Sequence, residues 1–283
     1  MSNRRAARAS LDQFVELMTP AVVRAGTLAR SLEGRVSNSP KRDEVSDVKQ
    51  ALTLADTGTQ EIILKALLEH YPEVCLAAEE DTETVDAFPK DADAQVVIDP
   101  IDGTLRSYLE GTGPYAVIVG VAVREVFQAS LVSLPREGIV LDATRGRGAY
   151  KTVGGRSRRS VRAETDGNRI LVSHGMPSAV SDVLRAKGYE VVPSCGGAVS
   201  VAPLIKGVCA GVRFADTPVG VSIRGRVGVL IAREGGALVR AAAGADFPDD
   251  LTTRRPTVLL ASEPQQLDDL DDALREGLGE GLG

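Results

Sequence analysis

The chain has 283 residues, 43% of them hydrophobic and 25% charged, and its net charge is −6 at pH 7. This length suits one large domain or two smaller ones, and the composition is sufficient for a sizeable hydrophobic core. An acidic chain has no broad basic field to hold a nucleic acid polymer or an anionic membrane surface, so neither is expected as a partner. An acidic enzyme with an anionic substrate would need bound cations to offset the repulsion.

The cysteines and the N-terminus indicate where the protein works. The three cysteines lie far apart without C-x-x-C spacing, which is typical of reduced thiols in a cytosolic protein; they are Cys75, Cys195 and Cys209. The basic start MSNRRAARAS is not followed by an uninterrupted apolar run, as a secretory signal would be. No apolar run is long enough to span a bilayer. We therefore expect a cytoplasmic protein.

The first part of the chain predicts two helices. Residues 11–32 place apolar side chains at helical spacing, and Pro20 allows a kink within this helix. The polar stretch 33–50 contains Gly, Ser and Pro and predicts an exposed mobile loop. A second helix is predicted at about 55–70, and its expected buried face consists of Ile62, Ile63, Ala66 and Leu67.

Short apolar runs then alternate with turns. These runs are VCLAA, AQVVID, YAVIVGVAV, VFQASLVSL, GIVLDATR and GAYK. Strands of this length with few helices between them predict a largely antiparallel sheet.

A basic, glycine-rich stretch at 153–167 precedes a change of rhythm to alternating strands and helices. Strands are predicted at RILVSH, YEVVPS, AGVRFA, ALVRAA and TVLLAS, and helices at 178–188, 196–207 and about 221–233. An amphipathic tail helix begins at Pro264. We place the division in this stretch, with an N-terminal α+β half at 1–155 and a C-terminal α/β half at 156–283.

The motif DPIDGT carries the clearest chemical signal. Asp99 and Asp102 follow the apolar run QVVI, and Pro100 prevents a regular strand ladder. Gly103 permits a tight turn, and Thr104 can cap or open the next helix. Carboxylates beside free N–H groups at a helix start suit a phosphate bridged by a cation. A turn whose aspartates merely cap the backbone explains the motif equally well.

Two further acidic stretches add to this signal. LAAEED ends another apolar run with Glu79 and Glu80, and LTLADTGTQ places Asp56 at a helix start. Each alone is typical of a solvated turn or of an acid favoured by the helix dipole. Together, acids at the ends of neighbouring strands and at a helix start can converge on Mg²⁺, which prefers oxygen ligands.

These motifs resemble a known family. LTLAD, AAEED, DPIDGT and a late AREGG occur in the order found in the inositol monophosphatase-like family of lithium-sensitive, magnesium-dependent phosphomonoesterases. The likeness runs from the first helix to about residue 240. GRGAYKTVGGRSRRSV also resembles the family's hairpin near the domain join, and GGAVSVAPLIKG its substrate-side helix start. The resemblance implies a layered α-β-α-β-α sandwich, with a mostly antiparallel N-terminal sheet and a mixed C-terminal half, assembled as a homodimer.

The resemblance also implies magnesium-dependent hydrolysis of a small phosphate monoester. An inositol monophosphate-like substrate is favoured, and a 3′-phosphonucleotide or a sugar phosphate is the alternative. By the family pattern, Glu79, Asp99 and the carbonyl of Ile101 would hold a first Mg²⁺, and Asp99 and Asp102 would reach a second.

The same pattern implies roles in catalysis and substrate binding. Thr104, hydrogen-bonded to Asp56, would orient and deprotonate the attacking water, with Glu79 as the third catalytic residue. The residues expected to contact the substrate are Gly103, Thr104, Gly197, Ala198 and Arg224.

The family pattern is broken at one place. The family normally carries a Trp-Asp pair about ten residues before the Glu-Gly-Gly, and this aspartate completes the second metal site. Here the two positions hold Ile223 and Arg224, and the chain contains no tryptophan. The exchange of a carboxylate for a guanidinium changes the charge by two units. That change disfavours a second Mg²⁺ by several kcal/mol even under strong screening.

Four interpretations of this break remain open. Arg224 can replace the second cation and bind phosphate through its planar fork. Asp216 can bend into the gap. The protein can have lost hydrolysis and bind only a phosphorylated ligand or partner. Finally, Arg224 can be an ordinary surface residue at a helix start.

Overall fold

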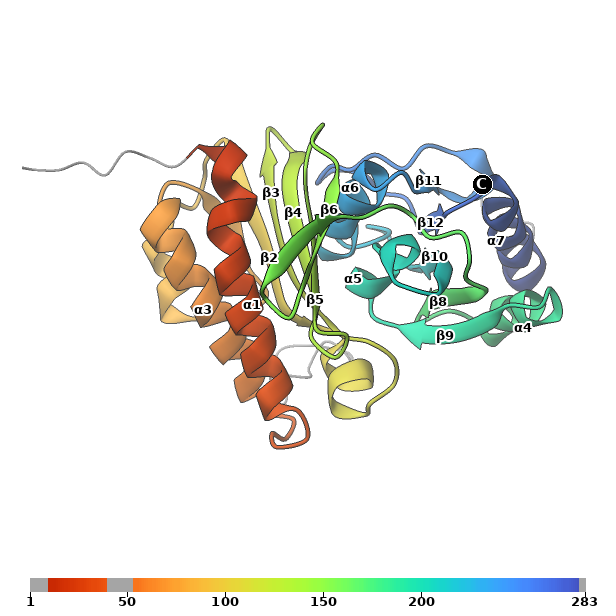
Figure 1. Cartoon of the computed structure of the whole chain (residues 1–283), viewed down its shortest axis with the longest axis horizontal. Helices are drawn as coiled ribbons and strands as arrows, with labels where there is room; N and C mark the ends of the chain where they lie inside the picture. Colours follow the sequence, from red (N-terminus) through yellow and green to blue (C-terminus); the bar gives the residue numbers. More distant parts are fainter. Residues whose placement is uncertain (1–9, 40–52, 280–283) are drawn as a thin grey trace, which may run out of the picture.

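The computed structural model describes residues 10–39 and 53–279, whose helices and strands form five layers along the long axis of the molecule (Figure 1). Two long helices cover the outer face of a seven-stranded sheet, and short helices lie between this sheet and a five-stranded sheet. Two more helices cover the outer face of the second sheet. The predicted α-β-α-β-α sandwich is confirmed.

The first helical layer consists of α1 (Phe14–Leu32) and α3 (Leu54–His70). A 3₁₀ turn, Leu11–Gln13, precedes α1, and α1 continues through Pro20 without interruption. In α3, Ile62 is only partly buried, whereas Leu64 is fully buried and replaces it on the predicted inner face. Most of the polar stretch predicted as a loop at 33–50 lies outside the described residues.

The seven-stranded sheet follows the order of the chain from β1 to β7. Its strands are β1 (Cys75–Ala77), β2 (Ala94–Asp102), β3 (Ala116–Val123), β4 (Val126–Leu134), β5 (Ile139–Thr144), β6 (Ala149–Val153) and β7 (Ser157–Ser160). Only the pairing of β1 with β2 is parallel, so the predicted antiparallel sheet is confirmed.

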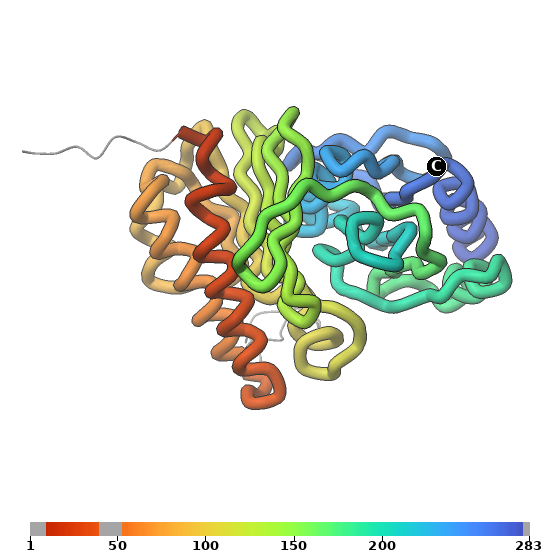
Figure 2. The backbone as a smooth tube through the Cα atoms, in the orientation of Figure 1, coloured from red at the N-terminus to blue at the C-terminus, as the bar shows by residue number. Residues whose placement is uncertain are grey.

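The pattern of apolar residues did not predict the edge strand β7, but the hairpin implied by the family resemblance over GRGAYKTVGGRSRRSV is present as β6 and β7. All four residues of β7 are exposed, so no alternation of apolar and polar side chains indicates a strand. Its register comes from pairing with β6, where Lys151 lies opposite Arg159. The hairpin of β6 and β7 folds back beside α1, where a Cβ added at Gly155 would lie 3.1 Å from Val23 Cγ1 (Figure 2).

The five-stranded sheet has the order β11-β12-β10-β8-β9. Its strands are β8 (Arg169–Ser173), β9 (Glu190–Ser194), β10 (Val208–Phe214), β11 (Leu238–Arg240) and β12 (Thr257–Ala261). Strands β8, β9 and β10 are parallel, whereas β12 is antiparallel to both of its neighbours. This mixed sheet agrees with the expected C-terminal α/β half.

Two of the predicted C-terminal helices are wrong in extent. The helices of this half are α4 (Ser178–Ala186), α5 (Gly196–Val199), α6 (Val227–Glu234) and α7 (Pro264–Leu278). The segment predicted as one helix at 196–207 ends after one turn and continues as a 3₁₀ turn at Ala202–Leu204. Pro203 lies in that second turn, and its missing N–H disfavours a continuous α-helix. The helix predicted from 221 begins as a 3₁₀ turn at Arg224–Arg226.

The two sheets share one hydrophobic core. Ile118 and Phe127 of the first sheet pack in the same cluster as Val199, Leu230 and Leu260 of the C-terminal half. All five side chains are fully buried. The division of the chain at residue 155 stays a prediction, because this shared core holds both halves together.

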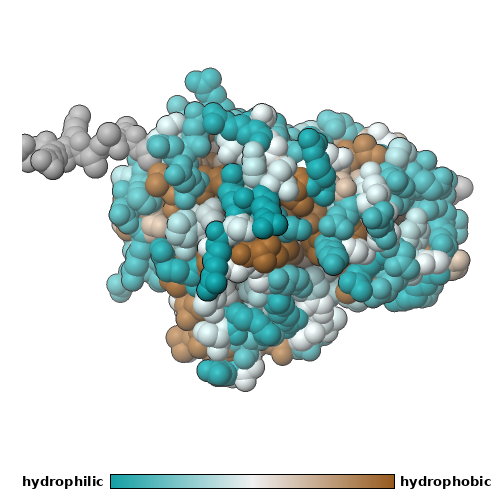
Figure 3. All heavy atoms as spheres, viewed as in Figure 1, coloured by the Kyte–Doolittle hydropathy of each residue, from teal (hydrophilic) through white to brown (hydrophobic). Residues whose placement is uncertain are grey.

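A shallow apolar groove of about 570 Å³ lies at the junction of the halves, and its lining includes Pro114, Ile139, Val153, Leu171 and Val192. Figure 3 shows hydrophobic side chains gathered near the middle of the displayed face. Within 10–39 and 53–279, no helix is long and apolar enough to cross a bilayer. The three cysteines are free and buried.

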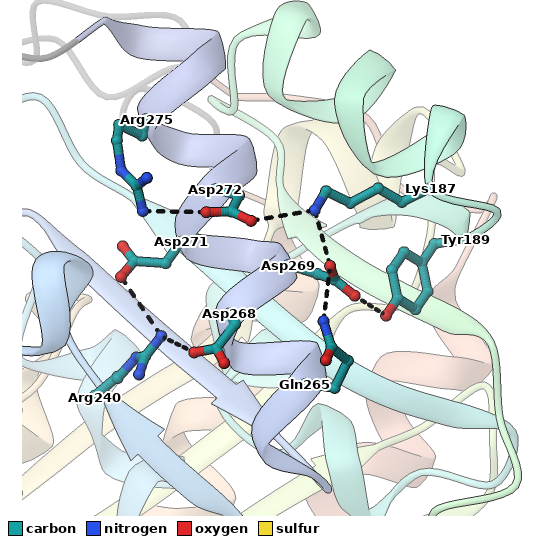
Figure 4. A network of polar contacts seen from close by, with 9 residues as sticks. All are labelled: Lys187, Tyr189, Arg240, Gln265, Asp268, Asp269, Asp271, Asp272 and Arg275. Carbon is teal, nitrogen blue, oxygen red and sulfur yellow. Dashed lines mark hydrogen bonds and ion pairs between the residues drawn. The ribbon is translucent and has the colours of Figure 1, made fainter.

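The helix α7 carries the acidic run DDLDD, and each of its aspartates has a partner (Figure 4). The pairs are Arg240 with Asp268 and Asp271, Lys187 with Asp269 and Asp272, Tyr189 with Asp269, and Arg275 with Asp272. The Nζ atom of Lys187 lies 2.8 Å from Asp269. Burial acts to raise the pKa of Asp269, but hydrogen bonds from Lys187 and Tyr189 hold it below its usual value.

Candidate functional site

Three carboxylates gather where β1 and β2 end. The two strands are parallel, with Ala77 opposite Val97, so the chain beyond them continues at the same edge of the sheet. This register brings Glu79, two residues beyond β1, level with Asp99 of β2. Asp102 ends β2. The predicted convergence of acids from separate motifs therefore follows from strand pairing.

A break in the ladder brings the two aspartates of DPIDGT to one side of the sheet. Asp99 pairs with Ile118 and Asp102 with Ala116, so β2 has one residue more than β3 over this interval. Successive strand residues point to opposite faces, and an extra residue at a bulge restores a common face. Strand β2 thus continues through Pro100, but its register is interrupted there.

Asp99 is buried and only partly neutralised. Its side chain is 5% exposed, and its Oδ1 atom has no hydrogen-bond partner. Burial raises the pKa of Asp99 well above its usual value, and the charges of Glu79 and Asp102 raise it further, whereas Arg224 acts in the opposite direction. The pocket therefore contains more negative charge than its cationic neighbour offsets.

Asp102 joins the two halves of the molecule. Its Oδ2 atom accepts a hydrogen bond from the backbone N–H of Gly197 in α5. A Cβ at Gly197 would lie 2.6 Å from Ile118 Cδ1, so only glycine fits this approach. The N–H of Ala198 donates to the sulfur of Cys195 at 3.4 Å. Of the two predicted substrate contacts of α5, Gly197 thus contacts an acid, and Ala198 is the next residue along the helix.

The turn after Asp102 requires glycine. Gly103 has a φ of +91°, and a Cβ there would lie 2.7 Å from Cys195 Cβ. Its carbonyl accepts hydrogen bonds from the N–H groups of Ser107 and Tyr108. Thr104 opens the following π-helical segment, Thr104–Leu109, and Gly103 occupies the cap position without a side-chain cap.

Thr104 and Asp56 form the predicted hydrogen-bonded pair. The Thr104 hydroxyl lies 3.0 Å from Asp56 Oδ1 and 2.7 Å from the carbonyl oxygen of Ile101. It has one proton to donate between these two acceptors. The motifs LTLAD and DPIDGT, 48 residues apart at this hydrogen bond, therefore meet at one hydroxyl group.

Asp56 is held by the cap of its own helix. Its Oδ2 atom accepts hydrogen bonds of 2.7 Å from both the backbone N–H and the hydroxyl of Thr53. The side chain is 1% exposed. Burial raises the pKa of Asp56 to about 6, although the hydrogen bonds from Thr53 and Thr104 oppose this shift. Asp56 is thus a carboxylate whose proton affinity lies near neutral pH.

Sequence reasoning missed a residue that positions the Glu79-Glu80 turn. Gln60, one turn after Asp56 on α3, is completely buried. Its Nε2 atom donates to the Glu80 carbonyl at 2.6 Å, and its Oε1 atom accepts from the Glu80 N–H at 3.0 Å. In the sequence, Gln60 appears only as an amide side chain among the apolar positions of the helix. Its partner lies 20 residues away, so the pattern of the helix does not reveal the contact.

Arg224 is turned toward the acids. Its Nε atom lies 4.0 Å from Glu79 Oε2, and its Nη2 atom donates to the carbonyl of Ala78 at 3.4 Å. Its side chain is 32% exposed, so it is not a free surface group. Asp216, the alternative candidate for the gap, is exposed, and it is not among the main charges that act on Asp99.

The acids suit a hard divalent cation by their chemistry. In the part of the chain that the structure describes, no group of three or more His, Cys, Asp or Glu side chains is arranged so that it could hold a metal ion. However, Asp99 Oδ1 is a buried oxygen without a partner, and a cation would relieve the repulsion among Glu79, Asp99 and Asp102. The carbonyl of Ile101 retains a second lone pair beside Thr104.

Comparison with known families identifies the chain. The model of the inositol monophosphatase family matches residues 10–270. The chain therefore belongs to the inositol monophosphatase family, which is a family of phosphatases.

Curated relatives are distant. The chain is 30% identical to a histidinol-phosphatase of Chlorobaculum parvum over 138 residues, which cover 48% of this chain and 49% of the relative. The chain thus spans about half the length of this relative. It is 25% identical to the Nus factor SuhB of Escherichia coli over 281 residues, which cover 91% of this chain and 98% of the relative.

Solved structures share the fold. An IMPase of Thermotoga maritima has a TM-score of 0.71 at 17% identity, covering 93% of this chain and 99% of its own. An IMPase/NADP phosphatase complexed with Mg²⁺ and phosphate has a TM-score of 0.70 at 17% identity, covering 96% and 98%. Likeness at this identity establishes the fold alone.

Proposed function

We propose that the protein is a magnesium-dependent phosphomonoesterase that hydrolyses a small phosphate monoester. One observation carries this proposal. A buried, incompletely neutralised Asp99 and the partly buried Glu79 and Asp102 lie at the ends of β1 and β2, near a threonine hydroxyl that contacts a buried aspartate. Membership of the family and the Mg²⁺ and phosphate named for one neighbour of the same fold support it.

The metal would be held by Glu79, Asp99, Asp102 and the carbonyl of Ile101. When bound there, Mg²⁺ would lower the pKa of a water molecule and offset the charge of the phosphate oxygens. The carboxylates would then share one cation, which offsets the burial and the mutual repulsion that raise the pKa of Asp99.

Thr104 and Asp56 would act on the attacking water. When the Thr104 hydroxyl donates to Asp56 Oδ1, its oxygen lone pairs face the site and can accept a proton from water. Glu79 would hold the same water from the metal side. The N–H groups of Gly103 and Thr104 would receive the phosphate, with Gly197 and Ala198 on the opposite wall.

Arg224 would take the place of a second cation. Its guanidinium lies beside Glu79 and lowers the pKa of Asp99, as a positive charge at the acid cluster should. A planar guanidinium can bind two phosphate oxygens at once. The site would therefore work with one firmly bound Mg²⁺.

A second candidate function is supported by the same contact. Arg224 Nε lies 4.0 Å from the Glu79 carboxylate and so competes with a metal for that ligand. A catalytically silent protein that binds a phosphorylated ligand or partner would tolerate this competition.

A phosphate-release screen separates the two candidates. The native protein should release phosphate from at least one of inositol 1-phosphate, histidinol phosphate, 3′-phosphonucleotides and sugar phosphates with Mg²⁺, and from none with a chelator. Arg224→Asp should rebuild a second metal site, so that activity requires more Mg²⁺. Absent turnover on all substrates, together with calorimetric binding of a phosphate ester, would establish the silent binder instead.

The remaining expectations concern location and assembly. We expect a cytoplasmic homodimer that binds neither membranes nor nucleic acid polymers, in line with the acidic charge and with the family resemblance. Sedimentation analysis of the purified chain tests the dimer directly, because a single species of monomer mass would contradict it.

A further inference from the structure

Arg213 lies at the edge of the acid site without a role in the chemistry described above. It occupies strand β10, whose parallel neighbour β8 ends at Ser173. The N–H of Phe214 donates to Ser173 Oγ at 3.3 Å. The next residue, His174, places Nε2 2.8 Å from Ser107 Oγ in the helical segment after DPIDGT. The end of β10 therefore reaches the same edge as the proposed phosphate turn.

The guanidinium of Arg213 packs against two glycines, each of which is next in sequence to a residue of the acid site. A Cβ added at either Gly196 or Gly225 would collide with its Nη1 atom. Gly196 directly precedes Gly197, which donates to the Asp102 carboxylate. Gly225 directly follows Arg224, which faces Glu79. Two backbone segments that lead to the acid site thus each have a glycine at the point where they contact this arginine.

The hydrogen-bonding capacity of Arg213 is incompletely used. Its Nη2 atom donates to Ser222 Oγ at 3.2 Å, but its Nη1 atom is buried without a partner. Within residues 10–39 and 53–279, no carboxylate lies at ion-pair distance from it. Arg226, which is fully buried, differs from the partly buried Arg213, because it donates to the carbonyls of Val221 and Asp250.

A partly buried cationic side chain with an unused, buried donor atom calls for an acceptor. Buried polar groups are nearly always paired, and an unpaired one is costly, especially when it is charged. Arg213 and Arg224 both belong to the C-terminal half, and each contacts a backbone segment that leads to the acids. Because Arg224 is placed to meet the phosphate, Arg213 is available for a different part of the substrate.

We propose that Arg213 is a specificity-determining residue that binds a second anionic group of the substrate. The preferred substrate is then a phosphate monoester that also carries a carboxylate or a further phosphate. A neutral polyol phosphate offers only hydroxyl acceptors to this guanidinium, and a substrate with a cationic amine is repelled by it. This inference rests on the proposed function, because it assigns the substrate class of the same site.

Kinetics of the intact protein with four probe substrates test the proposal. Phosphoglycolate offers a carboxylate, fructose 1,6-bisphosphate a second phosphate, glycerol 2-phosphate a neutral group and histidinol phosphate a cation. We expect kcat/KM to be about 10- to 100-fold higher for the better of the two anionic substrates than for the neutral one, the range of a charged hydrogen bond. The better of the first two probes identifies the second anion.

Variants at Arg213 separate recognition from structure. Arg213→Met should raise KM for the preferred anionic substrate about 10- to 100-fold and leave kcat and KM for glycerol 2-phosphate nearly unchanged. Arg213→Lys should recover part of the loss, because it keeps the charge without the fork. The control variant Arg185→Met, on the outer helix α4, should leave kcat and KM unchanged for both substrates.

The result that overturns the proposal is a wild-type protein without preference for an anionic substrate, or an Arg213→Met variant that loses all four substrates equally. The first measurement needs no variant and stands if Arg213→Met fails to fold. Absent turnover would contradict the proposed function alone. In that case calorimetric binding of phosphoglycolate and glycerol 2-phosphate to wild type and Arg213→Lys still decides whether the second anion is recognised.

Discussion

The chain has two clusters of acidic side chains, one assembled from separate motifs and one contiguous in sequence, and they differ in their physical state. The acids Glu79, Asp99 and Asp102 meet at the ends of β1 and β2, and the run DDLDD lies along α7 (Figure 4). Burial and mutual repulsion raise the pKa of Asp99 well above its usual value. On α7, hydrogen bonds from Lys187 and Tyr189 lower the pKa of Asp269 although burial opposes this.

The difference lies in the supply of partners. Every aspartate of the α7 run has a Lys, Arg or Tyr within hydrogen-bond distance, and these pairs fasten α7 to its neighbours. The strand-end cluster has one cationic side chain among the described residues, Arg224 at 4.0 Å from Glu79, and a backbone N–H on Asp102, while one oxygen of Asp99 has no partner. A paired acidic cluster serves stability, whereas an incompletely paired cluster with a buried aspartate is suited to receive a cation.

The largest expected effect is that of Asp99→Asn. Because Asp99 is central to the proposed metal site, activity should fall by about 1,000-fold or more and calorimetric Mg²⁺ binding should disappear. Thermal stability should not fall, since the substitution removes an incompletely compensated buried charge. Mg²⁺ binding of native strength in this variant would contradict the metal assignment. Asp269→Asn, in the paired cluster, should leave activity unchanged.

Thr104→Ala tests the hydroxyl that joins the two motifs. We expect kcat to fall by about 100- to 1,000-fold with little change in KM, because the water loses its proton acceptor while the phosphate keeps its amides and metal. Steady-state kinetics measure both constants. If kcat stays within a few-fold of the native value, Thr104 has only a structural role in the turn.

The pH dependence of stability distinguishes the clusters in the metal-free protein. The folded pKa of Asp56 is about 6 against an ordinary value of 3.8, so the folded state binds the proton more tightly and loses stability as pH rises from about 4 to 6. That difference corresponds to about 3 kcal/mol. The raised pKa of Asp99 acts in the same direction.

Urea unfolding with a chelator measures this effect as the difference between native protein and Asp56→Asn. Between pH 4.5 and 7.5, the unfolding free energy of the native protein should fall relative to that of Asp56→Asn. At the higher pH, Mg²⁺ should stabilise the native protein. A difference independent of pH would show that Asp56 titrates normally in the fold.

The smallest expected effect is that of Asp269→Asn on stability. Asp269 is 14% exposed at its side chain and pairs with Lys187, so its loss should lower the unfolding free energy by about 0.5–1 kcal/mol. Because its folded pKa lies below the ordinary value, its contribution is present above about pH 4 and is lost as pH falls further. A stability change as large as that of Asp56 would remove the contrast between the clusters.

The sequence by itself determined the layered fold and the acids of the candidate site. Short apolar runs mark strands β2 to β5, so local patterns predicted these strands, whereas the layered arrangement was implied by the family resemblance. The meeting of Thr104 with Asp56 was predicted through the family resemblance, and the structure contains this hydrogen bond. The metal and substrate roles of these residues stay predictions.

Only the tertiary structure decided the features that depend on distant partners. Strand β7 has four exposed residues and exists because β6 provides its hydrogen bonds. Gln60 reaches the backbone of Glu80, and Arg224 turns toward Glu79 across 145 positions of the chain. Arg213 is wedged between glycines from two other elements. No local period or spacing encodes such contacts, because they arise where separate elements pack and where burial decides which polar atoms find partners.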